Sequence, residues 1–142
     1  NRLDVAKEQL EKVIATFRQD VKFDLVFFDN GFKPWQPGLV PANEENRKAA
    51  IEYARAQQPR GGTNIYDPLE AAILMEGVDT VFLLTDGDPG SGKFIATEDI
   101  VREIGNLNRT RRVKVHTIAL GGTRELLVAL ARESGGRYVE AK

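Results

Sequence analysis

The sequence predicts one three-layer α/β domain, in which a mostly parallel central sheet is covered by helices on both faces. Helical and strand patterns alternate along the chain, which is typical of a parallel sheet wrapped by helices. The strand patterns are almost wholly apolar, as expected where both faces of a sheet are covered. The 142 residues are 42% hydrophobic and 29% charged, which fits a single globular domain over residues 1–142.

The first half of the chain predicts two helices separated by a covered strand. Apolar residues recur at helical spacing over 3–17, so an amphipathic helix should pack on the sheet. The run Phe23–Phe28 predicts a strand with both faces covered. Three prolines limit residues 31–41 to a short edge strand at most. A second helix is expected over 43–57, capped by its first residue, an asparagine.

The second half predicts three helices that alternate with three strands. Asp67 and Glu70 form a capping-box pattern around Pro68, which indicates that a helix starts there. Two more helices should be capped by Thr97 and Thr123, and a pair of glycines should end the last one. The predicted strands are residues 79–85, 113–120 and 137–139.

Composition excludes several classes of function. Lys and Arg (20) nearly balance Asp and Glu (21), so no net field favours nucleic acid or an anionic membrane. The chain has no cysteine, which excludes disulfides, thiolate catalysis and cysteine-ligated metals. No apolar run approaches the roughly 20 residues of a membrane span, so no membrane insertion by this segment is expected. A local site must therefore select the partner.

Two loops have the composition of a cation site. Ligands bind at the carboxyl ends of parallel strands, so a site is expected in the loops at that edge. In Gly61–Asp67, the hydroxyl of Thr63 follows two glycines just before a helix, and in Val81–Pro89 the carboxylate of Asp86 leaves a buried strand. Mg²⁺ prefers oxygen ligands in an octahedron, and these two side chains could supply two of them.

The chain resembles the von Willebrand factor type A (VWA) family, a Rossmann-like fold. The residues that carry the resemblance are the Gly-Gly-Thr-Asn loop at 61–64, the Leu-Leu-Thr-Asp-Gly-Asp-Pro run at 83–89 and the order of elements around them. The resemblance implies a non-enzymatic adhesion or assembly domain. Its metal-ion-dependent adhesion site would hold Mg²⁺, Mn²⁺ or Ca²⁺ and bind an acidic residue of a protein partner.

The resemblance also assigns the site residues. Thr63 and Asp86 would be metal ligands, Asp86 often acting through water, while Gly62, Asn64 and Asp88 would support the ligands or face the partner. The family's third loop, Asp-x-Ser-x-Ser at the end of the first strand, does not occur in the 142 residues. We therefore expect weak or no metal binding by residues 1–142 alone. No catalytic or organic cofactor-binding residue is expected.

The first strand and the closing helix of the family are both missing from the sequence pattern. The family's strand order would place the first strand between Phe23–Phe28 and Thr80–Thr85. Its absence would leave a slot about twice the 4.8 Å strand spacing, lined with unpaired backbone groups. We expect the chain to be a fragment of a longer one. A strand before Asn1, another chain or rearranged pairing would then fill the slot.

Two other functions remain open. A scaffold domain could keep the fold without using the metal. Gly87–Lys93 also has the Gly-x-x-x-x-Gly-Lys spacing of a nucleotide-binding P-loop after a buried strand. However, Phe94 stands where that mechanism needs a hydroxyl, and Pro89 removes one backbone N–H donor.

Several polar or aromatic residues have simpler structural interpretations. His116 lies in a buried strand pattern with no second imidazole available as a co-ligand. Trp35 is expected to cover the sheet edge, with partner binding as the alternative. The run at Arg109, Arg111 and Arg112 is expected to be a solvated helix end, where cations are favoured. Nucleic-acid binding is not expected, because no aromatic residues are interleaved with this run.

Overall fold

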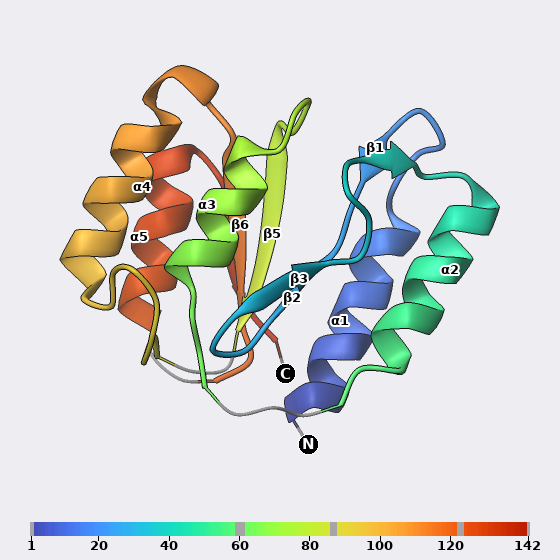
Figure 1. The fold of residues 1–142 in the computed structure, drawn as a ribbon, viewed down its shortest axis with the longest axis horizontal. Coiled ribbons are helices and arrows are strands. Elements are labelled where there is room, and N and C mark those ends of the chain that lie inside the picture. The colour runs from blue at the N-terminus through green and yellow to red at the C-terminus, as the bar shows by residue number, and fades with distance from the viewer. Residues whose placement is uncertain (1, 59–61, 86–87, 122–123, 142) are drawn as a thin grey trace.

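The computed structural model describes residues 2–58, 62–85, 88–121 and 124–141. These residues form five helices and a small parallel sheet, together with two short two-stranded antiparallel sheets (Figure 1). The elements are α1 (Arg2–Ala15), β1 (Lys22–Phe23), β2 (Val26–Phe28), β3 (Phe32–Pro34), β4 (Val40–Pro41), α2 (Glu44–Arg55), α3 (Tyr66–Leu74), β5 (Thr80–Thr85), α4 (Thr97–Arg111), β6 (Lys114–Ala119), α5 (Arg124–Ser134) and β7 (Tyr138–Glu140).

The parallel sheet has the order β5-β6-β7. Thr80 pairs with Lys114 at one end of the β5–β6 ladder, and Thr85 pairs with Ala119 at the other. Helices α3, α4 and α5 lie together on one side of this sheet, and α1 and α2 lie on the other (Figure 1). Alternation along a strand sends Leu83 into the core under α3–α5 and Phe82 to the opposite face. The ring of Phe82 lies 6.4 Å from that of Phe17, which follows α1.

The predicted strand over Phe23–Phe28 is the main departure within the first half. It is split into β1 and β2, which form separate antiparallel ladders with β4 and β3. The carboxylate of Asp24 accepts hydrogen bonds from the backbone N–H groups of Leu25 (2.8 Å) and Gln36 (2.9 Å). This local bonding replaces ladder pairing and breaks the strand. Burial raises the pKa of Asp24, and the two hydrogen bonds, which lower it, offset only part of this effect.

The helix boundaries agree more closely with the sequence. Asn43 caps α2 by accepting the backbone N–H of Asn46 at 2.8 Å, as predicted. Helix α5 ends just before Gly135, whose φ of 81° lies in the left-handed region that glycine tolerates. Thr97 is the first residue of α4 rather than its cap. The predicted cap Thr123 lies outside the described residues.

The described strands leave β2 and β5 in different sheets. Strand β2 pairs with β3, β5 pairs with β6, and within the described residues no ladder joins β2 to β5. Helix α3 contacts β2, β3 and β5, so it connects the two halves. Among the helices of the described ranges, none is both long enough and apolar enough to cross a membrane.

Candidate functional site

Three loops meet at the end of the sheet where β5 finishes. The carbonyl oxygen of Thr63 accepts hydrogen bonds from the backbone N–H groups of Gly90 (2.8 Å) and Ser91 (3.2 Å). These bonds hold Thr63 beside the segment that follows β5. The loops are the β2–β3 turn at 29–31, the segment 62–65 before α3, and the segment 88–93.

Asn64 joins these loops. Its backbone N–H donates to the carbonyl oxygen of Asp29 (2.7 Å), and its side-chain Nδ2 donates to the carbonyl oxygen of Asn30 (3.1 Å). Nδ2 also donates to Oδ2 of Asp67 (2.9 Å), while Oδ1 accepts the backbone N–H of Asp67 (3.1 Å). Asn64 is only 3% exposed, so its amide must find its partners inside the protein.

The Asn64–Asp67 pair corrects the predicted start of α3. The helix begins at Tyr66, so Asp67 lies in its first turn and does not precede it as a cap. Asn64 satisfies the free N–H of Asp67, and the Asp67 carboxylate bonds back to Asn64. This reciprocal arrangement resembles a capping box, and it lies three residues before the Asp67–Glu70 pair that the sequence predicts.

Asp67 and Asn30 extend the contacts to the loop after β5. Oδ1 of Asp67 accepts the backbone N–H of Lys93 (3.2 Å), and the Ser91 hydroxyl donates to Oδ1 of Asn30 (3.2 Å). We call Asn30, Asn64, Asp67 and Ser91 the loop network. It contains residues from all three loops and connects them by hydrogen bonds.

Two glycines allow these loops to approach closely. Gly62 (φ 88°) lies against the side-chain amide of Asn30, and Gly92 (φ 108°) lies against that of Asn64. A Cβ atom at either position would overlap the amide, and the positive φ values disfavour any other residue. The local chain path around Thr63 therefore depends on glycine.

An aromatic contact anchors the loop after β5 to α3. The rings of Tyr66 and Phe94 meet edge to face with centroids 4.8 Å apart. The Tyr66 hydroxyl donates to Oε2 of Glu70 (2.9 Å). Burial and the neighbouring carboxylates raise the pKa of Tyr66 to about 12, so it stays protonated and remains a donor near neutral pH.

The predicted site residues have different placements. Thr63 is half-buried, and its hydroxyl has no hydrogen-bond partner within the described part of the chain. Asp86 and Gly61 lie outside the described residues, while Gly62 and Asp88 are exposed. Among the described ranges, no three His, Cys, Asp or Glu side chains are grouped to hold a metal ion. Within the described residues the fit to a cation is therefore partial, since they supply the Thr63 hydroxyl and no cluster of carboxylates.

The described amide groups after β5, from residue 88 onward, do not form an open phosphate cradle. The N–H groups of Gly90, Ser91 and Lys93 all donate to protein acceptors, and α4 begins only at Thr97. A P-loop needs such groups free and a helix N-terminus aimed at the anion. This arrangement disfavours the nucleotide-binding alternative.

His116 has a structural role in the sheet. Its Nδ1 accepts the backbone N–H of Arg137 (2.9 Å), and its ring packs 5.0 Å from that of Phe82. Burial first, then the charges of Lys114 and Arg137, lower its pKa. A lowered pKa favours the neutral ring that can accept this hydrogen bond.

Sequence reasoning missed most of the loop network. Asn30 and Ser91 were not singled out, and Asp67 was interpreted as a cap. One signal was present: Asn64 stands three residues before Asp67, which is capping-box spacing. The contact of both with Asn30 depends on tertiary packing, which local patterns do not contain.

Comparison with known proteins gives the family. The von Willebrand factor type A domain family matches residues 1–140. The chain is 32% identical over 135 residues to human von Willebrand factor A domain-containing protein 3A, covering 92% of this chain and 11% of that protein. It is 36% identical over 104 residues to bovine inter-alpha-trypsin inhibitor heavy chain H4, covering 65% and 11%. The chain thus spans about a tenth of these relatives.

Solved structures share the fold. A von Willebrand factor type A protein from Catenulispora acidiphila superimposes with a TM-score of 0.83 at 21% identity, over 99% of this chain and 34% of that one. Proximal thread matrix protein 1 from the mussel byssus, with its metal-ion-dependent adhesion site occupied by zinc, gives 0.69 at 22%, over 98% and 36%. With a family match over nearly its whole length, the chain belongs to the von Willebrand factor type A domain family.

Proposed function

We propose that this domain binds a protein partner through a divalent cation held at the end of the sheet where β5 finishes. VWA domains are usually non-catalytic modules that bind proteins, and a solved relative carries a metal at its adhesion site. The observation that carries the proposal is the placement of Thr63. Its carbonyl oxygen is bonded to the loop that follows Asp86, and its hydroxyl has no hydrogen-bond partner among the described residues.

Each residue would have a defined role. Thr63 and Asp86 would offer a hydroxyl and a carboxylate, the oxygen ligands that Mg²⁺ or Mn²⁺ prefers. Gly62 would let the loop turn, and Asp88 would face the partner. Asn64 would hold the neighbouring Thr63 in position through its hydrogen bonds in the loop network. When bound, the cation would attract an acidic side chain of that partner. The remaining ligands would come from an Asp-x-Ser-x-Ser strand upstream of Asn1 or from another chain.

That strand would also complete the sheet. Because no ladder joins β2 to β5 within the described residues, a parallel strand could pair with the free edge of β5. It would bring its loop to the same end of the sheet as Thr63, since parallel strands finish at one edge. One inserted segment would therefore supply both the missing backbone partners and the missing ligands.

Calorimetric titration of Mn²⁺ into the full-length protein tests the proposal. Asp86→Asn and Thr63→Val should each weaken binding by about tenfold or more, which corresponds to roughly 1.4 kcal/mol per factor of ten. Asp79→Asn is the matched control, because Asp79 is an exposed carboxylate just before the opposite end of β5. Equal affinities for Asp86→Asn and Asp79→Asn would contradict the proposed role of Asp86.

A metal-independent scaffold is the second candidate. The observation that favours it is the loop network, which connects the three loops by hydrogen bonds among protein groups alone. A site that is already held in this way can present a fixed surface without a cation. Partner binding that survives chelation of divalent ions and the Asp86→Asn change would support the scaffold.

A further inference from the structure

A groove of about 420 Å³ lies between α4 and α5. Lys114, the first residue of β6, lines it, so it lies at the opposite end of the sheet from Thr63. Its apolar wall comes from Val101, Ile104 and Leu130, and its volume is within the roughly 300–1,000 Å³ of ligand pockets. A ligand there would leave the proposed cation site free.

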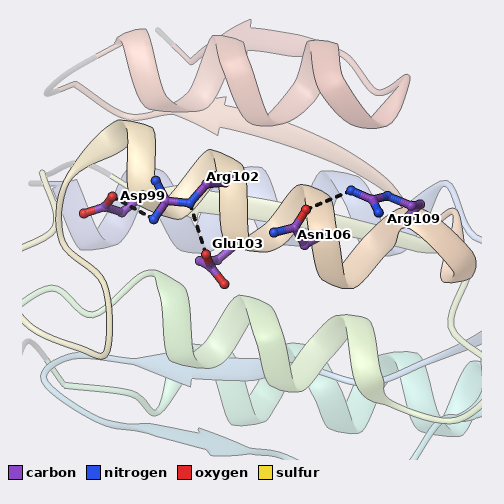
Figure 2. A network of polar contacts seen from close by, with 5 residues as sticks. All are labelled: Asp99, Arg102, Glu103, Asn106 and Arg109. Carbon is purple, nitrogen blue, oxygen red and sulfur yellow. Dashed lines mark hydrogen bonds and ion pairs between the residues drawn. The ribbon is translucent and has the colours of Figure 1, made fainter.

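One end of the groove carries basic side chains that have no carboxylate partner among the described residues. Arg109, Arg112 and Lys114 line this end, and none of them forms an ion pair with a described residue. Two of the three acids of α4, Asp99 and Glu103, already contact Arg102 (Figure 2), at 2.9 and 3.1 Å.

The amide of Asn106 is the partner left for Arg109, at 3.0 Å. Asn106 is neutral, so this bond leaves the Arg109 charge uncompensated. Glu133 is the one acid that lines the groove, and it also forms no ion pair within the described ranges. The positive charges in the lining therefore outnumber the negative one.

Two residues of this groove are locally unfavourable choices. Gly105 lies inside α4, where alanine is more stable, and a Cβ there would meet nothing within 4 Å. Arg112 has a φ of 55° at the end of α4, where glycine is favoured. Packing within the described chain explains neither residue. Such local exceptions tend to occur at functional sites, and both of these line one groove.

We propose that this groove binds an acidic peptide segment of a partner protein, one that carries aliphatic side chains. The carboxylates of the segment would contact Arg109, Arg112 and Lys114, and an aliphatic side chain would lie against Val101 and the bare backbone at Gly105. Charge complementarity selects the acidic class, because the basic groups form no ion pair with any carboxylate in the described part of the chain. The apolar wall distinguishes such a peptide from a simple polyanion.

Fluorescence titration of the full-length protein tests this with a short labelled peptide of glutamates interrupted by leucines. Arg112→Gly should weaken binding by about tenfold. Gly105→Leu should also weaken it, because the side chain fills the space above the helix. Both variants should keep or raise the melting temperature, since each replaces a locally unfavourable residue. A structural role alone cannot produce weaker binding together with higher stability.

Arg111→Gly is the matched control, because Arg111 is exposed on the same helix end but does not line the groove. It should leave peptide affinity within about twofold of the original. Three outcomes would overturn the proposal. They are no saturable binding below about 1 mM, equal effects of Arg111→Gly and Arg112→Gly, or equal binding of heparin, an oligonucleotide or a serine-for-leucine peptide.

Discussion

Replacing Asn64 with alanine is expected to lower the free energy of unfolding by about 3 kcal/mol. The change removes the acceptor for the N–H of Asp67 and the donor to Asn30 and Asp67. A lost cap costs about 0.5–2 kcal/mol, and each buried polar group left without a partner costs about 1–3 kcal/mol. Denaturant unfolding monitored by circular dichroism measures the difference.

Asn30→Ala is the control for Asn64→Ala. Asn30 is exposed, and its side chain makes one hydrogen bond in the described structure, to the Ser91 hydroxyl. Its loss should therefore cost less than about 1 kcal/mol. A similar small cost for Asn64→Ala would mean that Asn64 does not hold the three loops together.

Gly136→Ala is expected to destabilise the domain by about 3 kcal/mol, near the upper end for overpacked sites. A Cβ atom at Gly136 would overlap the carbonyl of Val115 in β6. Backbone cannot move aside as a flexible side chain can, so the chain between α5 and β7 would have to shift. Thermal or denaturant unfolding measures the loss.

Gly135→Ala separates this steric effect from backbone strain. Gly135 has a φ of 81°, but a Cβ there would meet no atom within 4 Å. Its substitution should cost about 1 kcal/mol, the lower end for a residue held in the left-handed region. If Gly135→Ala proved the more damaging of the two, the close approach of Gly136 to β6 would be refuted.

Elements with a strong local signal were predictable from the sequence. The helical spacing over 3–17 gave α1, Asn43 gave the start of α2, and the glycine pair gave the end of α5. The strand patterns 79–85 and 113–120 correspond to β5 and β6. In each case the signal is a periodicity or a cap contained within a few residues, so no distant contact had to be known.

Features that depend on distant contacts were not predictable. Asp24 breaks an apolar run because the N–H of Gln36, twelve residues away, reaches its carboxylate. Asn64, and not Asp67, supplies the side-chain acceptor at the start of α3, because the β2–β3 turn holds Asn64 in place through two hydrogen bonds. The candidate ligands Thr63 and Asp86 came from the composition of two loops, and the family resemblance then assigned their roles as metal ligands, which remain predictions.

The central claim is that Thr63 and Asp86 form part of a cation site whose other ligands lie outside residues 1–142. The direct measurement is calorimetric titration of Mn²⁺ and Mg²⁺ into residues 1–142 alone and into a protein in which an Asp-x-Ser-x-Ser strand precedes them. We expect weak or no binding by the first and tight binding by the second, lost on Asp86→Ala. Tight binding by residues 1–142 alone that Asp86→Ala abolishes would contradict the claim.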